Sequence, residues 1–309
     1  MSQSPAYPPL QASGPLPGVP HVLKRVYMIR HGETDANASG LMQGSGVDLP
    51  LSLKGRAQAK ALGDHFKDTP VDVIVVSALK RTLETAMYIK QYHPNAEVVS
   101  IEALNEISWG QYEGKLPTPG LKDLWREWEK GNFDASAPEG ESPLQTELRS
   151  VPALYNLMRN SSDQKVHYAI VIHGRLIRII LASILNHDLS YMNTYTHTNT
   201  CVNVLDAAIL GPGVSKESAD AFREQFLAAI KPRVASAAVS LAGGVDAVGA
   251  VLAAVTTQKE ASGATTPVNV ARPLPKEGPT VVSHPDVGHP NDIIFRAVAL
   301  NDTAHLANL

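Results

Sequence analysis

The chain has 309 residues, of which 44% are hydrophobic, so it is long enough to bury a core in one large domain or two small ones. Its formal net charge of -3 at pH 7 gives no basic footprint for nucleic acid. The single cysteine excludes an internal disulfide framework and fits a reducing compartment.

The ends of the chain and its apolar stretches bear on location. No charged stretch followed by an apolar run opens the chain, so we expect no secretory signal and predict a cytoplasmic protein, with the nucleus as the alternative. Residues 1–20 are rich in Pro, Ser and Gly and predict a disordered tail. Residues 234–255 are apolar but small, and glycines and an aspartate interrupt them, so we expect no membrane span.

A strand that ends in charged residues follows the tail. The apolar run from Val22 to Ile29 predicts a strand, and Arg30, His31 and Gly32 come directly after it. Ligands of open parallel sheets bind at the carboxyl ends of strands, so we expect a site here. Arg30 offers a planar donor fork suited to phosphate, and His31 is a nitrogen nucleophile that ionises near neutral pH. Taken alone, the string is also compatible with an exposed loop that has no chemical role.

A loop and a helix come next. Residues 35–51 contain several glycines and predict a long loop over the strand end, a common place for functional residues. Ser52 is expected to cap a helix over about 53–67, whose apolar face would consist of Leu53, Ala57, Ala61, Leu62 and Phe66.

The apolar, β-branched run at 71–76 predicts a buried parallel strand. In the helix that follows, Ser77, Arg81 and Thr85 are spaced four apart and share one face. We expect Arg81, in the first turns, to point toward the same sheet edge as His31. The inward apolar face of this helix would consist of Leu79, Leu83, Ala86, Met87 and Ile89.

The pattern of a strand ending in histidine and glycine occurs a second time. A short strand near 98–99 and two helices, about 121–130 and 143–159, precede it. The buried strand at 168–172 ends in His173-Gly174, and a helix begins at once. The two strand-end histidines, together with Arg30 and Arg81, predict a cationic pocket at one edge of one sheet.

The composition changes after a strand predicted at 201–205. Residues 207–290 are dominated by Ala, Val, Gly, Ser and Pro and hold one amphipathic helix, about 216–230. A last strand over 293–298 would return to the core. We therefore predict one domain, residues 21–206 plus 291–309, with 207–290 as an insertion that is partly helical or disordered. An oligomerisation or docking role for the insertion is the alternative.

Many short motifs follow one another in a fixed order. They are Arg30-His31-Gly32-Glu33-Thr34 with Asn37, Gln43-Gly44, Asp48, Pro50-Leu51, Gly55, Gln58-Ala59, Ser77, Leu79-Lys80-Arg81, Thr85-Ala86, Leu104-Asn105-Glu106, Gly110, Glu113-Gly114, Pro138-Glu139-Gly140-Glu141-Ser142 and His173-Gly174. Together they resemble the histidine phosphatase superfamily, the phosphoglycerate mutase-like group. The resemblance covers about 21–206 plus the final strand and implies an α/β fold, a three-layer sandwich with a mostly parallel central sheet.

The resemblance also implies a phosphohistidine intermediate on His31 and proton transfer by Glu106. Phosphoryl transfer needs charge neutralisation, which Arg30, Arg81 and His173 would supply. The leaving alkoxide needs an acid opposite the nucleophile, and we assign Glu106 to this role, with a surface or ion-pairing carboxylate as the alternative. We expect further substrate contacts from Asn37, Gln43, Gly44, Gly174 and Arg175.

Three features depart from the family pattern. The loop between Gln43 and Asp48 looks one residue longer than in the family pattern, Arg175 stands where the family commonly has a small or amide residue, and 207–290 has no counterpart in compact members. We expect no metal site and no cofactor. Four other histidines lack the regular spacing of metal ligands, and we interpret them as loop or surface residues. They are His167, His187, His197 and His305.

Three functional hypotheses follow. The first is a phosphomonoesterase acting on small phosphorylated metabolites, with sugar phosphates favoured. The second is a phosphoglycerate-type mutase; Arg126 stands alone where such mutases carry an adjacent arginine pair, which favours water access over retention of the phosphoryl group. The third is a non-catalytic interaction module, against which the full catalytic set argues. We expect a small metabolite as partner, no nucleic acid and no membrane, and leave open whether the chain forms a homo-oligomer.

Overall fold

A computed structural model describes residues 7, 8, 10, 19–234, 289–307 and 309. The strands in these ranges are β1 (His21–Arg30), β2 (Val73–Val76), β3 (Glu97–Ser100), β4 (His167–Ile172), β5 (Val202–Leu210), β6 (Arg233–Val234) and β7 (Ile293–Asp302). The α-helices are α1 (Asp35–Ala38), α2 (Leu53–Phe66), α3 (Lys80–Lys90), α4 (Pro119–Glu129), α5 (Pro143–Asn160), α6 (Gly174–Leu181) and α7 (Lys216–Ala228). Shorter helical turns are η2 (Glu102–Leu104), η3 (Gly110–Tyr112), η4 (Ala182–Asn186), η5 (Leu189–Asn193) and η8 (Ala304–Leu306).

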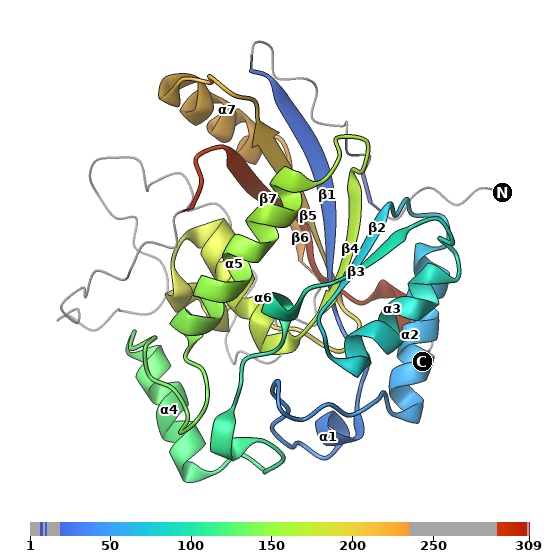
Figure 1. Cartoon of the computed structure of the whole chain (residues 1–309), viewed down its shortest axis with the longest axis vertical. Helices are drawn as coiled ribbons and strands as arrows, with labels where there is room; N and C mark the ends of the chain where they lie inside the picture. Colours follow the sequence, from blue (N-terminus) through green and yellow to red (C-terminus); the bar gives the residue numbers. More distant parts are fainter. Residues whose placement is uncertain (1–6, 9, 11–18, 235–288, 308) are drawn as a thin grey trace.

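The strands form one sheet in the order β3-β2-β4-β1-β5-β7-β6. Strands β3, β2, β4 and β1 run parallel, β5 lies antiparallel to both β1 and β7, and β6 runs parallel to β7. Helices α5 and α6 lie on one side of the sheet and α2 and α3 on the other (Figure 1). The predicted α/β sandwich with a mostly parallel sheet is therefore confirmed.

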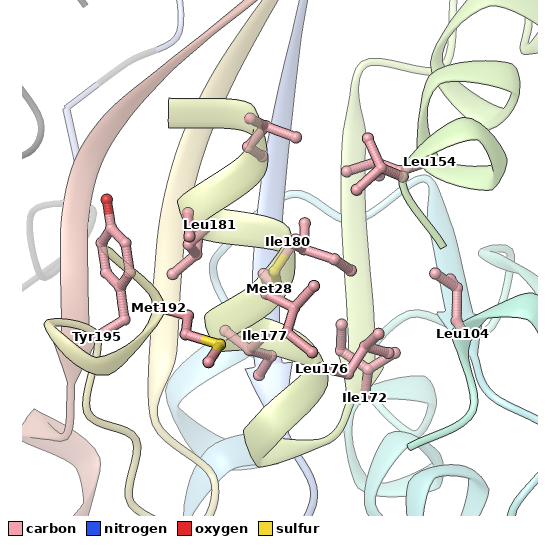
Figure 2. Close-up of a cluster of buried hydrophobic side chains, with 14 of the residues drawn as sticks. Met28, Leu104, Leu154, Ile172, Leu176, Ile177, Ile180, Leu181, Met192 and Tyr195 are labelled. Carbon is pink, nitrogen blue, oxygen red and sulfur yellow. The ribbon is translucent and has the colours of Figure 1, made fainter. Parts of the chain in front are cut away.

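Helix α6 is the centre of the larger hydrophobic core. Its residues Leu176, Ile177 and Ile180 are fully buried and belong to one cluster with Met28 of β1 and Ile172 of β4, as Figure 2 shows. Burying one such side chain contributes about 1.5–3 kcal/mol relative to leaving it in water. This packing fixes the first turn of α6 against the carboxyl ends of β1 and β4.

On the opposite face of the sheet, two predictions are wrong, namely which side chains of α2 and which of α3 are buried. Leu53 of α2 is 84% exposed, and Leu83 and Met87 of α3 are each 45% exposed, although all three were expected to face inward. The buried face of α3 instead includes Arg81 and Thr85, together with Thr82, Ala86 and Ile89. Polar residues take part of the inward face because that end of α3 approaches the sheet edge where the polar site lies.

The carboxyl-terminal half of the sheet extends further than the sequence pattern indicated. Strand β5 continues past residue 206, and residues 207–209 pair with both β1 and β7. Helix α7 confirms the helix predicted at about 216–230, and β7 confirms the last strand. The rest of the predicted insertion, 235–288, lies outside the described residues, as does most of the predicted disordered tail.

The residues at 7, 8 and 10 are the described part of that tail. Tyr7 is buried, and its ring lies 5.8 Å from that of Tyr27 on β1. Within the described ranges, no helix combines the length and the hydropathy needed to cross a bilayer.

Candidate active site

The two strand-end histidines meet because their strands are parallel neighbours. Arg30, the last residue of β1, is paired with Ile172, the last residue of β4. The backbone N–H of His31 donates to the carbonyl oxygen of Ile172 at 2.9 Å, and the rings of His31 and His173 lie 5.3 Å apart between centroids. The structure thus brings together the residues that the two His-Gly motifs contribute.

The ring of His31 is held in one orientation. Its Nδ1 lies 2.7 Å from the carbonyl oxygen of Gly32, so Nδ1 carries the proton and Nε2 keeps its lone pair when the ring is neutral. Burial, and then the charges of Arg81 and Arg30, hold the pKa of His31 well below its usual value of 6.5. At neutral pH the residue therefore presents an uncharged nitrogen, which is the form that can attack an electrophile.

His173 is fixed from two sides. Nε of Arg81 donates to Nδ1 of His173 at 3.2 Å, so the proton of the neutral ring lies on Nε2, which is 2.8 Å from Oγ of Ser77. Burial, and then the charge of Arg81, keep the pKa of His173 well below 6.5. Both ring nitrogens have partners in this structure, so His173 contacts a bound phosphate only if one of these bonds is exchanged.

Two arginines keep their charges beside the histidines. Arg81 is fully buried, and its remaining donors bond to the backbone carbonyls of Val47 at 3.0 Å and Gly44 at 3.1 Å. Burial lowers its pKa to about 10, which still leaves it charged at neutral pH. Arg30 donates to the carbonyl of His197 at 2.8 Å, and its buried Nε has no hydrogen-bond partner among the described residues. Carbonyl partners orient the guanidinium groups without neutralising them, so the pocket attracts an anion.

Glu106 lies at the first turn of α6. Its Oε1 accepts from the N–H groups of Ile107 at 3.0 Å and Leu176 at 2.9 Å, and its Oε2 accepts from that of Arg175 at 3.1 Å. The N–H groups at a helix start are a favourable place for a negative charge. Glu106 is 6% exposed. Its negative charge offsets part of the lowering of the pKa values of Arg30 and Arg81, so the carboxylate belongs to the same pocket.

The five predicted substrate-binding residues occupy different places around the pocket. Asn37 closes the capping box of α1. Gln43 accepts from Thr34 and donates to the carbonyl of Val47, so it supports the loop that holds Arg81. A Cβ on Gly174 would lie only 3.1 Å from Nε of Arg30, which explains a glycine at this contact. Gly44 accepts from Arg81, and Arg175 extends from α6.

Several residues of this site were not singled out as site residues from the sequence. Nδ2 of Asn199 donates to the carbonyl of His31 at 3.0 Å, and the N–H of Thr200 donates to that of Arg30 at 3.0 Å. Oγ1 of Thr85 accepts from the N–H of Gly32 at 3.0 Å. Thr85 could have been found, because it shares a helical face with Arg81; the loop at 194–200 carries no periodic signal. Its His197, interpreted as a loop or surface residue, is a buried loop residue.

No group of three or more His, Cys, Asp or Glu side chains within the described ranges is arranged to hold a metal ion. The candidate site brings together the two imidazoles of His31 and His173, the two guanidinium groups of Arg30 and Arg81 and the carboxylate of Glu106 around the carboxyl ends of β1 and β4.

The sequence and the fold of this chain have counterparts among known proteins. The sequence pattern of the histidine phosphatase superfamily (branch 1) matches residues 26–216. The chain is 31% identical over 183 residues to PhoE, an uncharacterized phosphatase of Bacillus subtilis (strain 168), across 59% of this chain and 88% of that protein. It is also 31% identical over 160 residues to 2,3-bisphosphoglycerate-dependent phosphoglycerate mutase 2 of Gloeobacter violaceus, across 50% of this chain and 72% of that protein.

Solved structures agree with the sequence matches. A mycobacterial glucosyl-3-phosphoglycerate phosphatase in complex with VO3 superposes with a TM-score of 0.53 at 27% identity, across 59% of this chain and 90% of that chain. The family pattern covers more than half of the chain, including both His-Gly motifs, Arg81 and Glu106. The chain therefore belongs to the histidine phosphatase superfamily.

Proposed function

We propose that this protein is a phosphomonoesterase that hydrolyses small phosphorylated metabolites through a phosphohistidine on His31. The observation that carries the proposal is the neutral ring of His31, whose Nδ1 is bound to Gly32 and whose Nε2 is left for attack, beside two arginine charges. A phosphoryl dianion bound by Arg30 and Arg81 would lie next to that nitrogen. Relatives of the chain include both phosphatases and mutases.

The first half of the reaction transfers the phosphoryl group to the protein. Nε2 of His31 attacks phosphorus in line, the bond between phosphorus and the substrate oxygen breaks, and Glu106 gives its proton to the leaving oxygen. Arg30 and Arg81 hold the equatorial oxygens, where the charge of the transition state lies. Glu106 must take up a proton before this step, and the approach of the substrate dianion favours the protonated carboxyl.

The second half returns the protein to its starting state. Glu106, now ionised, accepts a proton from a water molecule that attacks the phosphohistidine. The bond between phosphorus and Nε2 breaks, and inorganic phosphate leaves. The same carboxyl thus acts as acid and then as base, as microscopic reversibility of the two halves requires.

Hydrolysis is favoured over mutase activity by the segment of α4. Arg126 is the single arginine of α4, and it is exposed and forms an ion pair with Asp123, so this helix lacks the arginine pair that would retain a reoriented intermediate. A sugar phosphate is the substrate class that we favour within the phosphomonoesters, because it presents a dianion on a small polar body.

The experiment compares three proteins for hydrolysis of p-nitrophenyl phosphate without added metal. We expect turnover by the wild type, none by His31→Ala, and unchanged turnover by His167→Ala, a matched variant at the opposite end of β4. Activity that survives in His31→Ala would remove His31 from the mechanism. Isomer formation that strictly requires a bisphosphate primer would favour the mutase, and intact fold with no turnover at all would favour a non-catalytic module.

A further inference from the structure

The backbone that leads into Glu106 is bound by one side chain of α5. Nη1 of Arg149 donates to the carbonyl oxygens of Ala103 at 2.8 Å and of Asn105 at 3.0 Å. Nη2 of the same residue donates to the carbonyl oxygen of Glu106 at 3.1 Å. A single guanidinium thus holds three carbonyl groups on and directly before the residue that we assign as the proton donor.

Glu141, in the segment that precedes α5, orients this guanidinium. Its Oε1 accepts from Nε of Arg149 at 2.7 Å and its Oε2 accepts from Nη2 at 2.8 Å, which is the bidentate arrangement that an arginine fork and a carboxylate favour. Burial raises the pKa of Glu141, but the hydrogen bonds from Arg149 and from the N–H of Ser108 outweigh burial and hold the pKa below its usual value. Glu141 therefore keeps its charge at neutral pH.

The same carboxylate binds the chain on the other side of Glu106. Oε2 of Glu141 also accepts from the N–H of Ser108 at 2.9 Å. In return, the N–H of Glu141 donates to the carbonyl oxygen of Ser108 at 2.9 Å. Arg149 and Glu141 together hold the backbone before and after the proton donor.

The helix that carries Arg149 is fixed in the hydrophobic core. Leu154 of α5 and Leu104, which precedes Asn105, belong to the same buried cluster, as Figure 2 shows. The side chains of Arg149 and Glu141 are 24% and 26% exposed, so water screens this pair only in part. A supporting residue on a packed helix holds its partner more precisely than one on a loop.

The carboxylate of Glu106 depends on where this backbone lies. Two of the N–H groups that it binds belong to Arg175 and Leu176, in the first turn of α6, where helical N–H groups have no partner within the helix. A shift of the backbone at Glu106 would move the carboxyl away from these donors and from the leaving oxygen of the substrate. A displacement of about 1 Å can lower a rate by about 100-fold.

We propose that Arg149, oriented by Glu141, is a positioning residue that holds the carboxyl of Glu106 where it protonates the leaving oxygen. The proposal rests on the proposed function for the role of Glu106. In this role neither Arg149 nor Glu141 touches the substrate, because both act through the backbone of Glu106.

The first test separates the placement of the acid from a general defect. An alkoxide leaves only when it is protonated, whereas p-nitrophenolate leaves without a proton. We expect Arg149→Met to lower kcat for β-glycerol phosphate by about tenfold to hundredfold and kcat for p-nitrophenyl phosphate by less than about threefold. The KM of each substrate should change by less than about threefold, because the phosphoryl contacts are intact. Glu141→Gln, a milder change of nearly the same volume, should shift the ratio of the two kcat values in the same direction.

Two further variants assign the effect to the guanidinium fork. Arg159→Met is the matched control, because Arg159 lies on the same helix and donates to Asp292 with Nε at 3.1 Å and Nη2 at 2.7 Å. It should leave both rates unchanged. Arg149→Lys keeps the charge without the planar fork, so its ratio of kcat values should resemble that of Arg149→Met. A wild-type ratio in Arg149→Lys would show that the charge alone matters and would overturn the positioning role.

The second test does not depend on turnover. Amide hydrogen exchange of the full chain measures how well the carboxylate of Glu106 protects the N–H groups of Arg175 and Leu176. We expect these two groups to exchange at least about tenfold faster in Arg149→Met than in the wild type, and at the wild-type rate in Arg159→Met. Wild-type exchange in Arg149→Met would overturn the inference.

The outcomes separate this inference from the proposed function. If the wild type hydrolyses both phosphates and Arg149→Met loses the two rates equally, the inference fails and the proposed function stands. If the wild type hydrolyses neither phosphate, the proposed function fails, and the exchange rates alone decide whether Arg149 positions Glu106. The exchange rates also decide if the wild type hydrolyses only p-nitrophenyl phosphate.

Discussion

The side-chain amide of Asn199 donates a hydrogen bond to the carbonyl oxygen of His31, with 3.0 Å between the two atoms. The next residue, Thr200, has a φ of 59° and donates its N–H to the carbonyl of Arg30. A left-handed conformation is strained for a β-branched residue, and such strain persists only where the surroundings hold it. The loop that precedes β5 therefore holds the backbone of Arg30, the cationic last residue of β1, and of His31, the nucleophile that follows it.

Asn199→Ala should lower the turnover of p-nitrophenyl phosphate by about fivefold to tenfold. The lost hydrogen bond is worth about 1 kcal/mol, and we expect this loss to appear as poorer positioning of His31. The measurement is kcat and KM separately, with the decrease in kcat. Asn132→Ala, which removes an exposed amide beside Glu127, is the control and should leave kcat unchanged. A variant with normal kcat would show that this loop does not position the nucleophile.

The pH dependence of stability follows from the buried histidines. Burial, followed by a nearby arginine charge, holds the pKa values of His31, His173 and His197 well below 6.5 in the folded protein. In the unfolded chain these three histidines titrate near pH 6.5, so below about that pH the unfolded chain binds more protons than the folded chain. Stability is therefore retained above about pH 7 and is lost as the pH falls toward about 5.

One of these histidines contributes about 1.4 kcal/mol to that loss for each pH unit below 6.5, until its folded pKa is reached. We expect His31→Asn, which cannot titrate, to lose about that much less stability than the wild type between about pH 7.5 and about pH 5.5. Urea unfolding at the two pH values measures the difference. Identical losses in both proteins would mean that His31 is protonated as easily in the folded chain as in the unfolded one.

How far the sequence predicts this molecule depends on the range of each interaction. The pattern of an apolar strand followed by His-Gly is local, and it was enough to place His31 and His173 at one sheet edge. The four-residue spacing of Arg81 from Ser77 was equally local. The contact between Asn199 and His31 is different, because it forms only when β5 pairs antiparallel with β1 across a long stretch of chain.

The prediction of buried faces from apolar periodicity was wrong where polar residues are buried. In α3 the leucine and methionine spacing selected Leu83 and Met87, but Arg81 and Thr85 take the inward face to reach His173 and Gly32. Glu33 follows the first His-Gly motif in the chain, but its carboxylate pairs with Lys54 and accepts from the hydroxyl of Ser52 at the start of α2. In both cases the partners of a polar group decided the outcome, and hydropathy alone does not encode them.

A buried charge cluster joins the two halves of the sheet. Asp206 of β5 pairs with Arg25 of β1 at 2.8 Å and with Arg296 of β7 at 2.9 Å, and all three side chains are buried. Asp206→Ala would remove the carboxylate from two buried guanidinium groups, which costs about 3–5 kcal/mol. Urea unfolding should show this loss, whereas Asp123→Ala, from an exposed pair with Arg126, should cost less than about 1 kcal/mol. A small effect at Asp206 would mean that water reaches the cluster.

The role of Glu106 as proton donor predicts a dependence on the leaving group. An alkoxide leaves only when it is protonated, while p-nitrophenolate is stable enough to leave without a proton. Glu106→Gln should therefore lower kcat for an alkyl phosphate by about 10²–10⁴-fold and lower kcat for p-nitrophenyl phosphate much less. Glu129→Gln, an exposed position on α4, should change neither rate. Equal losses on both substrates would show that the carboxylate acts by holding the N–H groups of α6, because a structural defect does not distinguish leaving groups.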